Sequence, residues 1–223
     1  MAVEAVVFDF DGLLMDTEST MLASWQHEWR WHGLELDTAS FFADHGGDVS
    51  DHHYAKLAAA VGPAYDRAAS HARRLAYRDH LNARLDLQPG IADWLIQAGQ
   101  LGLRLAVATS SGRGWASKHL HGRGSLAAFE FLACGDEVAR PKPDPGVYLL
   151  ALQRLALPAR QVVAVEDSPH GVAAAQAAGL RCVAIPNQHA DAARFATADL
   201  VLASAAHQRL DEVLRTLAKS EKS

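Results

Sequence analysis

The sequence predicts an α/β fold, in which a doubly wound parallel sheet carries an inserted domain of helices. Short apolar, β-branched runs alternate with segments of helical periodicity, as in AVVFDF at residues 5–10 and QVVAVEDS at residues 161–168. Near-continuous apolar strands are typical of parallel sheets that helices cover on both faces. The chain has 223 residues, of which 49% are hydrophobic, so it is long enough to bury the large core that this fold requires.

Six segments are expected to form the strands, and each one ends in a polar cluster. In chain order they lie at residues 5–10, 103–111, 129–137, 161–168, 180–186 and 198–204. Helical patterns separate them or follow them, at residues 91–102, 112–120, 172–179 and 207–223.

The long interval after the first strand shows no convincing strand. Amphipathic segments at residues 19–33 and 65–85 predict helices instead. The pair Pro89 and Gly90 then marks the return to the sheet. We therefore expect a catalytic core made of residues 1–15 and 88–223, with a helical domain inserted at residues 16–87.

Composition and charge exclude several classes of function. The formal net charge is -5 and no run of lysine or arginine is long enough to bind a polyanion, so nucleic acid is not expected as a partner. The first apolar run is only as long as a strand and lacks a basic leader, so neither a signal peptide nor a membrane span is expected. Cys134 and Cys182 fit no metal or redox spacing, which suits structural thiols in a reduced compartment. We expect a cytoplasmic protein, either a monomer or a homodimer.

Polar residues that carry chemistry stand at the ends of the predicted strands. Because ligands bind beyond the carboxyl ends of parallel strands, these residues should converge on one crevice. Two carboxylates on one edge of a strand end repel each other unless a divalent cation holds them. Together with hydroxyl groups and one cation, the carboxylates fit phosphoryl transfer. The set comprises Asp9, Asp11, Thr109, Ser110, Ser111, Lys142, Glu166 and Asp167.

Four segments in this order resemble the motifs of the haloacid dehalogenase superfamily, specifically its phosphatase and phosphomutase branch with a small helical cap. FDFDGLLMDTE is similar to the first motif, VATSS to the second, the lysine of RPKPDPGVY to the third and VAVEDSPHGVAAAQAAG to the fourth. The match covers essentially the whole core, whereas the cap matches only in position and helical character. The resemblance implies a Rossmann-like core and a cap at residues 16–87.

The resemblance also implies a role for most residues of the set. Asp9 would attack phosphorus and form an aspartyl-phosphate, while Asp11 would protonate the leaving alcohol and then take a proton from water. Thr109 would give a hydroxyl hydrogen bond, and Ser110 a backbone N–H, to the phosphoryl oxygens. Lys142 would pair with Asp9 and with the phosphate.

The cofactor that the resemblance implies is Mg²⁺. Asp9, Asp167 and the backbone carbonyl of Asp11 would bind the ion, which would keep Asp9 ionised and clamp the phosphate. Glu166 would either join the metal shell through a water molecule or orient Lys142.

Hydrolysis is favoured over two alternatives. A β-phosphoglucomutase-like enzyme would return the phosphoryl group to a sugar, but Met21 falls where that family carries a histidine, and the loop GGDVSDHH lacks its arginine. A non-catalytic sensor of phosphorylated metabolites would need neither Asp9 nor Asp11. The expected substrate is a small phosphorylated metabolite, and the many hydrogen-bonding groups of residues 43–51 favour a sugar or polyol phosphate.

Other side chains have simpler structural interpretations. Thr109 and Ser111 fit caps of the helix that follows them, and Ser168, which precedes a proline, fits another helix cap. Trp25 and Trp29 stand four residues apart, as on the packed face of a helix. The remaining candidates are expected on the surface of the cap, with contact to substrate as the alternative. They are the histidines His45, His52 and His53 and the arginines Arg73, Arg74 and Arg78.

Overall fold

The chain folds into two compact units. The computed structural model describes residues 2–38, 41 and 50–220. The sheet unit comprises Met1–Asp16 and Asp86–Ser223, and the helical unit comprises Thr17–Leu85. Within the described ranges, no helix combines the length and the apolar character that crossing a membrane requires.

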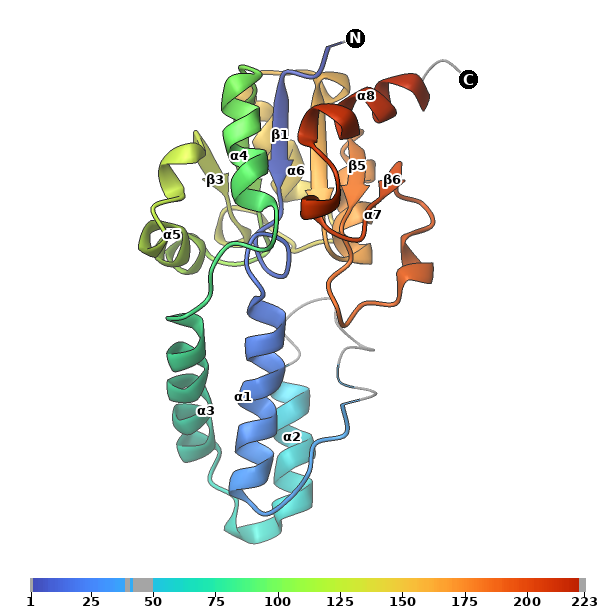
Figure 1. Ribbon diagram of the computed structural model, residues 1–223. Helices are drawn as coiled ribbons and strands as arrows, with labels where there is room; N and C mark the ends of the chain where they lie inside the picture. Colours follow the sequence, from blue (N-terminus) through green and yellow to red (C-terminus); the bar gives the residue numbers. More distant parts are fainter. Residues whose placement is uncertain (1, 39–40, 42–49, 221–223) are drawn as a thin grey trace. The chain divides into compact units, whose positions relative to one another are not determined.

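The sheet unit contains a six-stranded parallel sheet (Figure 1). Its strands are β1 (Ala5–Phe8), β2 (Arg104–Ala108), β3 (Phe131–Ala133), β4 (Val162–Glu166), β5 (Arg181–Ala184) and β6 (Leu200–Val201). They are ordered β3-β2-β1-β4-β5-β6, so the chain starts in the middle of the sheet and winds outwards in both directions. The predicted α/β class is confirmed, and each of the six predicted segments contains a strand.

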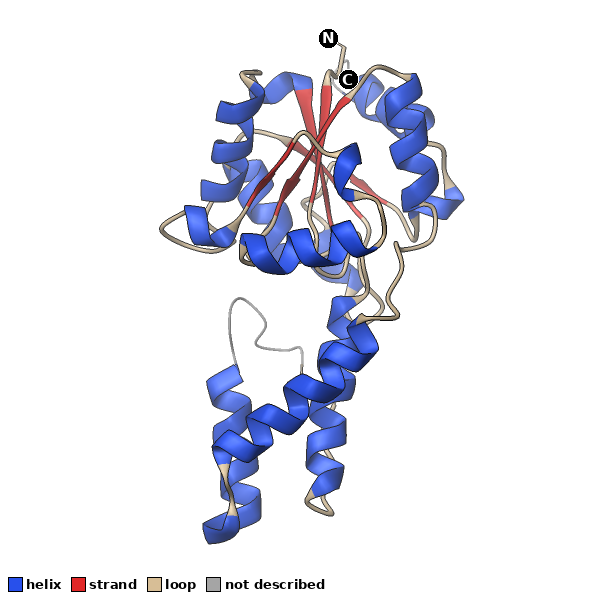
Figure 2. Cartoon of the chain, turned by 90° about the vertical axis from the view of Figure 1, so that its left-hand side faces the viewer, coloured by secondary structure: helices blue, strands red, loops and turns tan. Residues whose placement is uncertain are grey.

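Helices cover both faces of this sheet, as Figure 2 shows. They are α4 (Ile91–Gln100), α5 (Arg113–Gly122), α6 (Gly146–Leu155), α7 (Pro169–Ala177) and α8 (Leu210–Ser220). Val147 of α6 and Val172 of α7 share a core cluster with alternate strand residues such as Val7, Ala106 and Ala164. Helices α4 and α8 contact each other on the opposite face (Figure 1). Short 3₁₀ helices lie in the connections, at Leu126–Ala128, Gly135–Glu137, Ala159–Gln161, Ala192–Phe195 and Ala205–His207.

The register of the strands brings the predicted site residues to one edge of the sheet. Phe8 pairs with Val107 of β2 on one side and with Val165 of β4 on the other. Because the strands are parallel, the residues that follow lie side by side where the three central strands end. These residues are Asp9, Ala108 and Glu166.

Ser168 caps α7 as the sequence predicts. Its hydroxyl accepts a hydrogen bond from the backbone N–H of Gly171 at 3.1 Å, and the proline that follows it opens the helix. The cap predicted for α5 is wrong, because its N-cap residue is Gly112, which has no side chain to donate or accept. A carboxylate oxygen of Asp136 accepts the hydrogen bond from the first helical N–H, that of Arg113, at 3.0 Å.

The helical unit contains α1 (Thr17–Trp31), α2 (Ser50–Val61), the 3₁₀ helix Gly62–Ala64 and α3 (Arg67–Asn82). Helices α1 and α3 pack against each other. Trp25 is buried with Phe41 and Tyr54, and Trp29 packs on the same cluster, which confirms the predicted apolar face of α1. Residues 43–49 of the loop that suggested a sugar lie outside the described residues.

Two of the side chains predicted on the surface of this unit are buried. His53 is 6% exposed and stacks on the ring of Phe41, with 4.4 Å between the ring centroids. His52 is exposed as predicted, and His45 lies outside the described residues. Arg74, the second side chain that was predicted on the surface but is buried, is 3% exposed although it carries a charge.

Contacts with other helices explain why a charged side chain of α3 is buried. The guanidinium of Arg74 lies 4.5 Å from the ring centroid of Trp25, and its Nε donates to the hydroxyl of Tyr54 at 2.8 Å. Arg73 forms an ion pair of 2.7 Å with Glu28, whose side chain is fully buried. The predicted solvated position is therefore wrong for Arg74, whereas Arg73 is half-buried. The partners of both residues lie on α1 and α2, far away in the sequence.

Gly90, the N-cap residue of α4, lies very close to another part of the sheet unit. Its φ of +85° lies in the left-handed region, and a Cβ atom there would lie 2.2 Å from the backbone nitrogen of Ala206. We expect Gly90→Ala to lower the free energy of unfolding by about 3 kcal/mol or more, because backbone strain and a steric clash add.

Gly102→Ala is the matched control for this substitution. Gly102 has a similar φ of +69°, but a Cβ atom there would meet nothing within 4 Å. It should cost only about 1 kcal/mol, the strain alone. Urea unfolding of the two variants measures both effects, and equal losses would contradict the clash.

Candidate active site

Lys142 lies at the centre of the predicted site. Its Nζ atom donates to Asp9 Oδ1 at 2.5 Å, to Glu166 Oε1 at 2.6 Å and to the backbone carbonyl of Ala108 at 2.8 Å. An ammonium group has three donors, so these contacts use all of them. The side chain is 6% exposed. The structure therefore brings Asp9, Lys142 and Glu166 together, from three segments far apart in the sequence.

Glu166 is held from several sides. Its Oε1 also accepts from the hydroxyl of Tyr148 at 2.6 Å, and its Oε2 lies 3.4 Å from the hydroxyl of Ser168. A Cβ atom at Gly171 would lie 1.9 Å from this carboxylate, so α7 leaves room for it only because that position is glycine. Sequence reasoning missed Tyr148, although it stands in the quoted RPKPDPGVY segment, near the start of a helix that follows the lysine.

Asp167 lies beside this group, with 3% of its surface exposed. Its Oδ2 accepts from the side-chain amide of Asn187 at 2.7 Å, a partner that follows β5 and that sequence reasoning missed. Carboxylate oxygens of Asp9, Glu166 and Asp167 all lie within 4.8 Å of one another. Three buried carboxyl groups therefore lie close together, and two of them contact the ammonium group of Lys142.

The charge imbalance appears in the pKa values. Burial raises the pKa of the Asp9 carboxyl to about 8, although the attraction of Lys142 opposes this rise. Burial alone would lower the pKa of Lys142, but the carboxylates of Asp9 and Glu166 raise it well above its usual range. The ammonium group is therefore charged at neutral pH, and a further cation beside Asp9 would favour its ionised form.

Asp11 is bound by neutral donors from the segment that follows β2. Its Oδ2 accepts from the hydroxyl of Ser111 at 2.6 Å and lies 3.5 Å from that of Thr109. Its Oδ1 accepts from the indole N–H of Trp115, on α5, at 2.9 Å. Sequence reasoning missed Trp115, which stands one helical turn after Ser111.

The loop after β2 also contains Thr109 and Ser110, the predicted phosphate ligands. Thr109 is buried, and its hydroxyl accepts from the backbone N–H of Ser111 at 3.0 Å. Ser110 is exposed, and its hydroxyl accepts from the backbone N–H of Lys142 at 3.2 Å. A Cβ atom at Gly135 would lie 2.0 Å from the carbonyl oxygen of Ser110, so a glycine there permits the loop to approach closely. The loop thus joins the lysine segment to Asp11.

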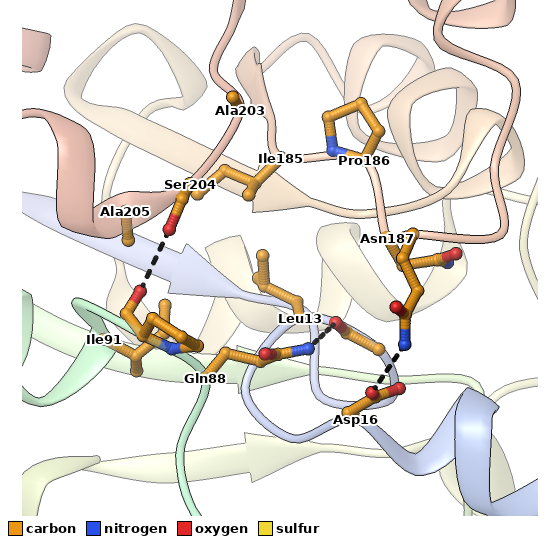
Figure 3. A pocket seen from close by; sticks show the side chains of 13 residues that line it. Leu13, Asp16, Gln88, Ile91, Ile185, Pro186, Asn187, Ala203, Ser204 and Ala205 are labelled. Atoms are coloured by element: carbon orange, nitrogen blue, oxygen red, sulfur yellow. Dashed lines mark hydrogen bonds between the residues drawn. The ribbon is translucent and has the colours of Figure 1, made fainter.

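A cavity of about 370 Å³ lies in the same sheet unit (Figure 3). Asn187 lines it, and the neighbouring Gln188 donates to Asp16 Oδ2 at 3.1 Å across it. Among the lining side chains Asp16 alone is charged, so the cavity offers no cation to a phosphoryl group. The cluster around Asp9 contains the ammonium group of Lys142 and is therefore the better candidate.

A second acidic group, Cys134, Asp136 and Glu137, also has ligand atoms within 4.8 Å of one another. Glu137 is already paired, at 2.7 Å, with Arg154 and with Arg113. Burial raises the pKa of the Cys134 thiol to about 11, so it stays neutral. A neutral thiol and a carboxylate that already faces two guanidinium groups bind a cation poorly, so the three carboxyl groups around Asp9 are the better candidate.

Known proteins resemble the chain over almost all of its length. The sequence model described as haloacid dehalogenase-like hydrolase matches residues 6–185. CbbY from Rhodobacter capsulatus is 34% identical, over 96% of this chain and 100% of the relative. Hexitol phosphatase A from Escherichia coli (strain K12) is 31% identical over 92% of both chains. The crystal structure of CbbY from Rhodobacter sphaeroides in complex with phosphate has a TM-score of 0.72 and 32% identity, and the match covers 92% of this chain and 95% of that one.

Glu137 gives a prediction for the pH dependence of stability. Hydrogen bonds from Arg154, from the backbone N–H of Cys134 and from Arg113 lower the pKa of its carboxyl from 4.5 to about 2. A lowered pKa in the folded state stabilises the fold above pH 4.5, and this contribution is lost as the pH falls towards 2.

Glu137→Gln should therefore lower the free energy of unfolding at pH 7, because the charged hydrogen bonds of the carboxylate are lost. The loss should be only about 2 kcal/mol, because the carboxyl is partly solvated. Its difference from the unmodified protein should shrink as the pH falls below 4.5. Denaturant unfolding across this pH range measures it, with Glu212→Gln, an exposed position on α8, as the control. A difference that does not change with pH would show that charge is not the cause.

Proposed function

The chain belongs to the haloacid dehalogenase-like hydrolase family, and we propose that it is a Mg²⁺-dependent phosphatase that acts through an aspartyl-phosphate on a small phosphorylated metabolite. The family and its phosphatase-named relatives make it a phosphoric monoester hydrolase. The observation that carries the finer proposal is the buried Lys142, which joins Asp9 to Glu166. A nucleophile beside a fixed cation suits attack on an anionic phosphoryl group.

In the first half of the reaction, Asp9 and Asp11 have different roles. A carboxylate oxygen of Asp9 attacks phosphorus, and the bond between phosphorus and the alcohol oxygen breaks. Asp11 gives its proton to that oxygen, so the product leaves as an alcohol. Lys142, together with Thr109 and the backbone of Ser110, offsets the charge of the phosphoryl oxygens.

The second half of the reaction regenerates the enzyme. Asp11, now ionised, takes a proton from a water molecule that attacks the phosphorus of the aspartyl-phosphate. The bond between phosphorus and the Asp9 oxygen breaks, and phosphate leaves. Because Asp11 loses and regains one proton, the cycle balances without any further acid or base.

The donor set fits Mg²⁺, which prefers carboxylate and carbonyl oxygens. Asp9, Asp167 and the backbone carbonyl of Asp11 would hold the ion. Glu166 already accepts hydrogen bonds from Lys142 and Tyr148, which favours a role in orienting the lysine over direct binding of metal. When bound, the ion would supply positive charge that offsets the phosphoryl oxygens and the three buried carboxylates.

The substrate class follows from the relatives and from the helical unit, which we assign as the cap. One relative is named for a hexitol substrate, which supports a sugar or polyol phosphate. Met21 packs on the cluster of Trp25, Phe41 and Tyr54 and has no group that exchanges protons, so this position does not favour a mutase. A sensor without activity would not require the paired carboxylates Asp9 and Asp11.

Asp9→Asn should lower phosphate release by about a thousandfold or more, because the covalent route is lost with its nucleophile. The assay is phosphate release with Mg²⁺ across sugar phosphates, polyol phosphates, phosphoglycolate and nucleotides. β-Glucose 1-phosphate is also scored for conversion to glucose 6-phosphate. Conversion without release would replace hydrolysis by mutase activity, and binding without either reaction would indicate a sensor.

Mg²⁺ binding can be tested without measuring activity. Saturating Mg²⁺ should raise the midpoint of thermal unfolding by about 5 °C, since a ligand that binds only the folded state stabilises it, and EDTA should reverse the rise. Asp167→Asn should abolish the shift. Asp136→Asn, in the second acidic group, should leave it unchanged, and the reverse pattern would place the ion at the wrong cluster for catalysis.

A further inference from the structure

We infer that Trp115 is a positioning residue for Asp11, and that it affects substrates with poor leaving groups most. This inference rests on the proposed function, in which Asp11 is the acid and base. Trp115 lies on α5, outside the segments whose residues the reaction uses, and its indole N–H donates to Asp11.

Both carboxylate oxygens of Asp11 are held from one segment of chain. Oδ1 accepts from the indole N–H of Trp115 at 2.9 Å, and Oδ2 accepts from the hydroxyl of Ser111 at 2.6 Å. Two hydrogen bonds from different directions fix the plane of a carboxylate, whereas one would leave it free to rotate. Asp11 is half-buried, so these contacts replace part of its solvation.

The indole ring of Trp115 is itself held in place. His119 stands one helical turn further along α5, and its ring centroid lies 4.1 Å from that of Trp115. Nδ1 of His119 lies 2.9 Å from the carbonyl oxygen of Trp115, which can only accept, so this nitrogen donates. Phe10 stands between Asp9 and Asp11 in the sequence, and its ring centroid lies 6.2 Å from that of His119. Trp115 thus presents its N–H from a ring with little freedom.

The two donors differ in a way that suits a group that loses and regains a proton. The indole N–H only donates, so Trp115 can bind Oδ1 in the same manner throughout the cycle. A hydroxyl can donate or accept, so Ser111 can adapt when Oδ2 carries a proton. We therefore assign the constant orientation of Asp11 to Trp115. An acid that is misdirected by a small angle transfers its proton poorly, and the loss matters only where the leaving group needs that proton.

Trp115→Phe tests this role, because phenylalanine keeps a ring against His119 and removes the N–H. We expect kcat on the best polyol or sugar phosphate to fall about tenfold or more. The rate on nitrophenyl phosphate, whose leaving group needs little protonation, should change less than about threefold. Equal losses on both substrates would overturn the inference and assign Trp115 a merely structural role, and no loss on either would overturn it as well.

Two further variants separate the possible failures. Trp94→Phe removes another indole N–H, that of Trp94 on α4, which donates to the backbone carbonyl of Gln208 at 2.8 Å. This variant should show no difference between the two substrates. Asp11→Asn should show the same substrate preference as Trp115→Phe but a larger loss. If Asp11→Asn shows no such preference, the proposed acid role fails. If it does and Trp115→Phe does not, only the positioning role fails.

Discussion

The buried ammonium group of Lys142 is the interaction on which the geometry of the site depends. Its three donors reach Asp9, Glu166 and the carbonyl of Ala108, which stand at the ends of β1, β4 and β2. These strands are neighbours in the centre of the sheet, so one side chain joins the ends of all three. Removing one partner from such a buried group costs about 3–5 kcal/mol, because the remaining charges are left uncompensated. The contacts of Lys142 therefore fix the position of Asp9, the proposed nucleophile, and also hold the ends of the three central strands together.

Asp9 and Asp11 come from one strand end but lie in different surroundings. Asp9 is buried and faces an ammonium group and two further carboxylates. Asp11 is half-buried and is bound by a hydroxyl and an indole, neither of which carries charge. Different environments are the means by which two neighbouring carboxylates can act separately as nucleophile and as acid. The separation depends on α5 and on the loop after β2 as much as on the strand.

In the helical unit, too, a buried charged group has a partner of opposite charge. Glu28 is fully buried and is paired with Arg73, while Arg74 lies against the rings of Trp25 and Tyr54. Both arginines contribute to the packing of the unit, although Arg73 is only half-buried. Arginine suits this position because its planar group stacks on aromatic rings and still donates hydrogen bonds.

Local patterns of side chains were enough to predict the α/β class, the six strands, the cap of α7 and the set of polar residues at the strand ends. The donors that bind each carboxylate depend on the tertiary structure: Trp115 for Asp11, Tyr148 for Glu166 and Asn187 for Asp167. The tertiary structure also decided that Arg74 and His53 are buried. Each of these contacts joins residues that are distant in the sequence, and only the packing of helices and loops around the sheet brings them within hydrogen-bonding distance.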